Sequence, residues 1–129
     1  MVLKFRRGDD FIPRLKNWLE RNRINSGFFY GLGGFLKAEL AFYDLKKKKY
    51  AKKKFPGGPF EVLSLVGNVA QGEKEIVVHC HAILGDKNYK TFGGHLVGAT
   101  VGGALELKLT QTEMLERKLD DETGLSLLR

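Results

Sequence analysis

The sequence has few of the features that indicate a secreted, membrane-spanning or disordered protein. Its 129 residues include one cysteine, Cys80, so no disulfide can form within the chain. No apolar run approaches the ~20 residues needed to cross a bilayer, and the N-terminus has no apolar signal core. Hydrophobic residues make up 43% of the chain and charged residues 29%, which excludes wholesale disorder. We therefore expect one cytoplasmic domain over residues 1–129, with no membrane association.

Acidic residues are scarce relative to basic ones, at 15 against 22, and the net charge is +7. Seven of the basic residues lie close together in the chain: Lys46, Lys47, Lys48, Lys49, Lys52, Lys53 and Lys54. Without these lysines the basic and acidic counts would be equal at 15, so the positive charge is a local patch. The patch could hold the phosphates of nucleic acid nonspecifically. It could equally form a solvated hairpin whose charge prevents pairing at a strand edge.

One segment near the N-terminus predicts a helix. Its apolar residues recur at helical spacing and are Phe11, Leu15, Trp18 and Leu19. Asp9 and Asp10 provide favourable charges at its start, and Pro13 is tolerated in a first turn. We expect a long helix from about residue 10 to residue 23, ended by Asn25-Ser26-Gly27.

From Phe28 onward, apolar residues recur at every second position and glycines become frequent, which is typical of strands joined by tight turns. The expected strands cover residues 2–6, 28–44 with a glycine bend at 31–34, 50–55, 60–69, 75–84, 91–100, 101–110 and 125–128. We expect an α+β (mixed α/β) fold, in which about seven strands form one mainly antiparallel sheet. The long N-terminal helix would pack on this sheet.

The three histidines of the chain, His79, His81 and His95, fall within a short stretch. Side chains alternate along a strand, so His79 and His81 should share one face while Cys80 points to the other. If the strand of His95 lies beside this one, three imidazoles would converge on one site. Such a set suits zinc and leaves one coordination position open. The alternative is that the histidines only form hydrogen bonds within a packed or polar environment.

Other residues that could take part in chemistry form no complete constellation. Glu61 and Glu106 interrupt apolar runs, and each could be a general base or a ligand, although alternation favours an exposed position. Asp44 and Asp86 could orient the histidines, or they could serve as ordinary turn residues. No nucleophile motif and no phosphate-binding glycine loop is present.

Several motifs occur in an order typical of one known family. They are Gly58-Pro59-Phe60-Glu61-Val62-Leu63-Ser64-Leu65-Val66-Gly67-Asn68, His79-Cys80-His81, Gly85-Asp86 and Gly93-Gly94-His95-Leu96. On these residues the chain resembles the PPC domain (plants and prokaryotes conserved domain, or DUF296) of the stand-alone prokaryotic type. Gly8-Asp9-Asp10, Gly31–Gly34 and Glu116–Leu125 fit the same pattern, so the resemblance covers nearly the whole chain.

The resemblance implies a mainly antiparallel α/β domain that assembles as a homotrimer. It also implies that His79, His81 and His95 form the polar site that carries zinc in some prokaryotic members. In plant members a Gly-Arg-Phe-Glu-Ile-Leu segment recruits partner proteins. The matching residues here are Gly58, Pro59, Phe60, Glu61, Val62 and Leu63, with proline in place of arginine. Plant members also carry an AT-hook, an Arg-Gly-Arg-Pro core for the minor groove, whereas this chain has only Arg6-Arg7-Gly8.

Three hypotheses follow. The preferred one is a homotrimeric binding or regulatory module with a metal or small-ligand site at His79, His81 and His95. The second is a protein that associates nonspecifically with DNA through the Lys46–Lys54 hairpin. The third is a zinc-dependent enzyme of unknown substrate, with a water on the open metal position.

Overall fold

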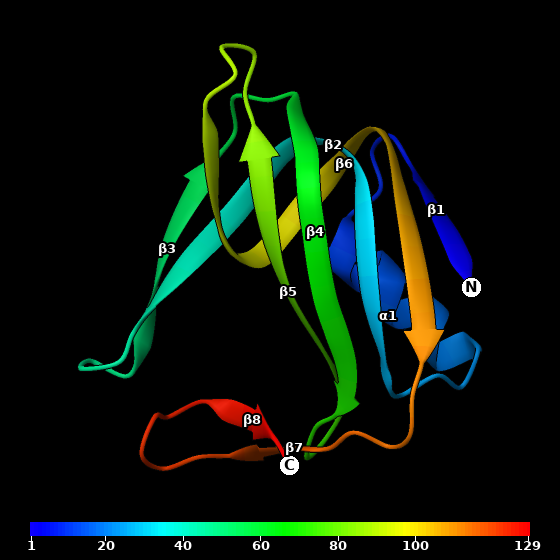
Figure 1. Ribbon diagram of the computed structural model, residues 1–129, viewed down its shortest axis with the longest axis vertical. Coiled ribbons are helices and arrows are strands. Elements are labelled where there is room, and N and C mark those ends of the chain that lie inside the picture. Colours follow the sequence, from blue (N-terminus) through cyan, green and yellow to red (C-terminus); the bar gives the residue numbers. More distant parts are fainter.

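The computed structural model describes residues 1–129 as one helix and eight strands (Figure 1). In chain order the elements are β1 (Val2–Arg6), α1 (Phe11–Arg21), β2 (Gly27–Asp44), β3 (Lys49–Phe55), β4 (Phe60–Gln71), β5 (Ile76–Gly85), β6 (Thr91–Gln111), β7 (Arg117–Leu119) and β8 (Ser126–Leu128). The mainly antiparallel sheet with a helix packed on it agrees with the predicted class. The single helix is neither long nor apolar enough to cross a membrane.

The main sheet has six strands in the order β1-β6-β5-β4-β2-β3, and all of its pairings are antiparallel. Strand β6 also pairs with β2, so β2, β4, β5 and β6 form a closed ring. The strands β7 and β8 form a separate two-stranded hairpin near the end of β4 (Figure 1). The prediction of about seven strands in one sheet was therefore wrong, because two of the strands form a separate sheet. Sequence patterns identify strands but do not show which strands pair.

A contiguous core of 23 buried residues joins α1 to the sheet. The helix contributes Phe11, Leu15 and Leu19, three of the four residues in the predicted stripe, while Trp18 is half-buried against the core. The ring of Phe11 packs edge-on against Phe5 and also lies beside Phe35. The opposite face of β2, β4 and β5 carries no helix and leaves several apolar side chains exposed.

The helix has 11 residues and is shorter than the predicted span of about 10–23. It ends in a Schellman-type turn, in which the Ile24 amide donates to the Leu19 carbonyl at 3.0 Å. Arg23 takes the left-handed conformation usually left to glycine, with φ of 56°. Because Ile24 is buried, the chain has to leave the helix here to place this side chain in the core.

Residues 91–110 were predicted as two strands but form one strand, β6, of 21 residues. The strand curves and crosses β2, and register shifts mark the crossing. A Cβ added at Gly33 would lie 2.2 Å from the Ala104 carbonyl oxygen, so only glycine allows the two backbones to approach this closely. The glycines therefore bend the strands here rather than end them.

Candidate metal centre

Strand β5 presents two histidines on its outer face. His79 and His81 point away from the core, whereas Cys80 between them is 2% exposed and packs inside it. This arrangement confirms the prediction from strand alternation. Burial raises the pKa of the Cys80 thiol to about 12, so Cys80 stays protonated and unreactive at neutral pH.

Strand β6 brings the third histidine to the same place. His95 is the register partner of His81, so β5 and β6 are neighbours. The three imidazoles therefore converge, as expected if these two strands lie side by side. The ring of Tyr50, from β3, stacks on the His95 ring with 4.6 Å between centroids. Three different strands thus fix the third imidazole.

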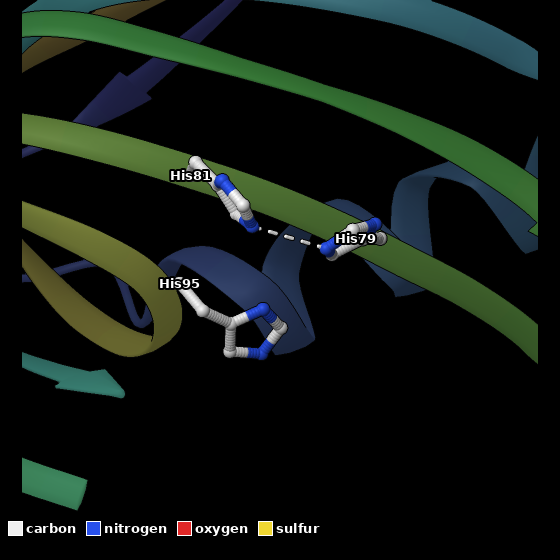
Figure 2. Close-up of side chains that lie close together, drawn as sticks. All are labelled: His79, His81 and His95. Carbon is white, nitrogen blue, oxygen red and sulfur yellow. Dashed lines mark hydrogen bonds between the residues drawn. The ribbon is translucent and has the colours of Figure 1, made fainter. Parts of the chain in front are cut away.

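The ring nitrogens converge at a spacing that suits one metal ion. Nε2 of His79 lies 3.2 Å from Nε2 of His81, and the candidate ligand nitrogens of all three residues lie within 4.8 Å of one another. Two nitrogens bound tetrahedrally at about 2.0–2.1 Å from zinc would be about 3.3 Å apart. Figure 2 shows one ring nitrogen of His95 turned toward the other two imidazoles. A small side-chain adjustment of His95 would complete the set.

Two buried side-chain atoms in the protein have no hydrogen-bond partner, and both belong to this site. They are Nδ1 of His95 and Nε of Arg117. A buried polar atom without a partner is costly and commonly marks a place for an absent ligand or ion. The donor set therefore fits a divalent metal with imidazole preference.

Arg117, on β7, is 7% exposed and contacts His79 through the other ring nitrogen. Its Nη2 lies 3.2 Å from Nδ1 of His79 and donates to Oδ1 of Asn68 at 2.7 Å, while Nη1 donates to the Ser126 carbonyl at 2.6 Å. Arginine only donates, so Nδ1 of His79 accepts and its proton resides on Nε2. A metal on that Nε2 would replace the proton now shared with His81.

Burial and nearby positive charge favour the neutral form of His79 and His95. Burial, followed by the charges of Arg117, His81 and His95, lowers the pKa of His79 from 6.5 to about 4. Burial, followed by the charges of His81 and Lys52, also lowers the pKa of His95. Neutral imidazole is the form that binds metal ions.

The comparisons with known proteins agree with this geometry. The family model of the plants and prokaryotes conserved (PCC) domain matches residues 1–113. The chain belongs to the PCC-domain family. No curated protein matches it.

Several solved structures resemble this one over almost their whole length. A metal-containing protein from Archaeoglobus fulgidus is 33% identical, with a TM-score of 0.89, covering 100% of this chain and 91% of its own. A plant- and prokaryote-conserved protein from Pyrococcus horikoshii is 29% identical, with a TM-score of 0.92, covering 100% and 90%. A candidate DNA-binding protein from Ralstonia eutropha is 28% identical, with a TM-score of 0.91, covering 99% and 89%.

In this PCC domain the seven clustered lysines do not form one surface. Lys48, Lys49 and Lys52 line a cleft beside the histidines. Lys54 lines a different pocket, and Lys53 lies over the Phe55 ring at 5.2 Å. Lys46 and Lys47 occupy the exposed turn between β2 and β3, where their amides donate to Asp44.

The remaining predicted residues lie apart from the histidines. Glu61 and Glu106 are exposed, as alternation favoured. The carboxylates of Asp44 and Asp86 accept backbone hydrogen bonds in turns, so the turn interpretation holds for both. The segment Gly58, Pro59, Phe60, Glu61, Val62 and Leu63 enters β4 with Phe60 and Val62 buried in the core.

Sequence reasoning missed Arg117, whose guanidinium contacts His79 directly. It lies in a tail without periodicity and beyond the residues that match the family model. The family resemblance covers Arg117 within Glu116–Leu125, but no spacing in the sequence relates this arginine to the histidines. Only the docking of the C-terminal hairpin brings it to the site.

Proposed function

We propose that this PCC-domain protein is a homotrimeric binding or regulatory module that holds zinc at His79, His81 and His95. The observation that carries the proposal is the 3.2 Å spacing of Nε2 of His79 and Nε2 of His81, with His95 opposite. An all-imidazole donor set suits zinc, and three protein ligands leave one position free for a small molecule. The metal would supply a Lewis-acidic centre that binds an oxygen or nitrogen of that molecule.

The trimer is supported by an apolar surface that adjoins the histidines. Tyr30, Val66, His81 and His95 form one cross-strand row, because each is the register partner of the next. The exposed apolar side chains on and beside this row include Phe28, Tyr30, Leu32, Val66 and Ile83. An apolar face of this extent gains from burial between subunits. The same contact would lie beside the metal centre.

The test is the elemental metal content of protein purified without chelating tags. We expect about one zinc per chain in the unaltered protein and none in a His79→Ala/His95→Ala double variant. Cys80→Ala is the matched control, since it lies between two of the ligands but faces the core, and it should retain the metal. Protein that stays metal-free after zinc is offered, while folded by circular dichroism, would contradict the proposal.

Association with DNA is the second candidate. It is supported by the description of the Ralstonia eutropha relative as a candidate DNA-binding protein and by the exposed lysines of the β2–β3 turn. If DNA is held there, Lys46→Glu/Lys47→Glu should reduce the slope of log affinity against log salt by about 2, with Lys74→Glu as control. No binding to duplex DNA at low salt would exclude this candidate.

A further inference from the structure

A cleft of about 950 Å³ lies beside the three histidines. One side is formed by the outer faces of β5 and β6, and the other by β3 and the C-terminal hairpin. Much of its lining is apolar or aromatic: Tyr43, Tyr50, Val77, Val78, Leu125 and Leu127. The volume suits a small organic molecule rather than a single ion.

All charged side chains that line this cleft are cationic. They are Lys48, Lys49, Lys52 and Arg117. Lys52 is close enough to depress the pKa of His95, and it shares a sheet row with Ala41 and His95. A divalent metal on the neutral histidines would add two further positive charges. Asp120 interacts with Lys48, whereas Lys52 and Arg117 form no salt bridge within the chain. The part of the site around Lys52 and Arg117 therefore needs negative charge from outside the chain.

Arg117 also lacks an anionic partner, whether or not a metal is bound. Its side chain is more than nine-tenths buried, and its hydrogen-bond partners are the neutral groups of Asn68, Ser126 and His79. Its Nε has no partner. The salt bridge in the structure, Lys16 with Glu75, lies elsewhere. A buried guanidinium without a counter-ion is costly, and a carboxylate or phosphate group is the partner that it binds best.

We propose that the cleft binds a small organic anion, a carboxylate or a phosphate ester. Its anionic group lies among Arg117, Lys52 and the open position of the metal, and its apolar part lies against Val77, Leu125 and Leu127. The contact with the metal rests on the proposed function, whereas the contacts with Arg117 and Lys52 do not. Arg117 lies on β7, so this anion site depends on the C-terminal hairpin.

The test is calorimetric titration of inorganic phosphate, phenyl phosphate and benzoate into zinc-loaded and zinc-free protein. We expect phenyl phosphate to bind more tightly than inorganic phosphate, because its ring contacts the apolar wall. Lys52→Gln should weaken binding at least about fivefold by removing one charged contact. Lys54→Gln, which removes a nearby charge outside the cleft, is the matched control and should leave the affinity unchanged. Benzoate against phenyl phosphate shows which anionic group the site prefers.

The outcomes separate this proposal from the metal site. Zinc uptake without binding of any of the three anions overturns the anion site and leaves the metal centre intact. Failure to take up zinc, with phenyl phosphate still bound and weakened by Lys52→Gln, contradicts the metal centre and supports the anion site. Equal weakening by Lys52→Gln and Lys54→Gln indicates nonspecific attraction and also overturns the anion site. Arg117→Gln can be added where that variant folds, and it should weaken binding more than Lys52→Gln.

Discussion

The two faces of strand β5 show how differently one strand can use neighbouring residues. Inward, Cys80, Ala82 and Leu84 are almost fully buried and belong to the common core. Outward, His79, His81 and Ile83 remain accessible, and the two histidines border the cationic cleft. Inward positions should therefore control folding, whereas outward positions should control binding and assembly. The predictions below test that division, beginning with the largest effect.

The sharpest test of the inward face is Leu84→Ala. Leu84 is 0% exposed, so its removal leaves a cavity and should lower the free energy of unfolding by about 3 kcal/mol. Leu45→Ala is the matched control, because Leu45 is 64% exposed in a turn and should change the stability by less than about 0.5 kcal/mol. Urea denaturation measures both. Equal decreases in the free energy of unfolding for Leu84→Ala and Leu45→Ala would show that burial of the side chain does not determine the loss of stability.

The outward face can be tested with Val66→Asp, at a position that is 51% exposed in the chain. If subunits meet on this face, the new carboxylate would be buried on assembly and should weaken association by about 2 kcal/mol per contact. Light scattering should then detect monomers at concentrations where the unaltered protein is trimeric. Leu45→Asp introduces the same charge away from the row and should leave the trimer intact. A Val66→Asp protein that remains trimeric would exclude this face as the interface.

Acid should destabilise the metal-free protein through protonation of His79. The pKa of His79 is about 4 in the folded chain against 6.5 when unperturbed, so the unfolded chain binds its proton first as the pH falls. Stability should thus be constant above about pH 6.5 and decrease between 6.5 and 4, by about 1 kcal/mol once partial exposure is allowed for. Thermal denaturation across this range measures it. His79→Gln should flatten the acid side of the profile, and an unchanged profile would show that another group is responsible.

The smallest effect concerns the hairpin that covers the outward face. The Tyr43 hydroxyl donates to the Thr123 carbonyl at 2.5 Å. Tyr43→Phe removes this bond and should cost about 0.5–1 kcal/mol, with faster hydrogen exchange in residues 117–128. Tyr30→Phe is the control, because Tyr30 is exposed and makes no such bond. Exchange that remains unchanged in Tyr43→Phe would show that the hairpin is held by its other contacts.

The same division explains which features could be predicted from the sequence. Alternation in residues 76–84 correctly placed Cys80 inward and the two histidines outward, since the rule is local to one strand. That His95 lies opposite His81 depended on strand order, which the residues alone left conditional. The end of the helix was misplaced because Arg23, rather than a glycine, adopts the left-handed conformation.

The features that could not be predicted arise where distant segments meet. The closure of β2 against β6 depends on which long strands become neighbours, and no periodicity encodes this. The seven lysines were treated as one patch because they are adjacent in sequence. The twofold alternation of β3 separates Lys52, near His95, from Lys53, over Phe55. Arg117 was missed for the same reason, since its role exists only once the hairpin docks.

The C-terminal hairpin has a consequence for rates as well as for affinity. It is held to the rest of the chain by a few polar bonds, among them Tyr43 with Thr123, Lys48 with Asp121 and Arg117 with Asn68. Segments held in this way open locally at a much lower free energy than the whole domain unfolds. The hairpin forms one wall of the cleft, so each local opening would remove part of the contact with a bound molecule. A variant that loosens the hairpin without unfolding the sheet, such as Tyr43→Phe, would therefore shorten the residence time of that molecule.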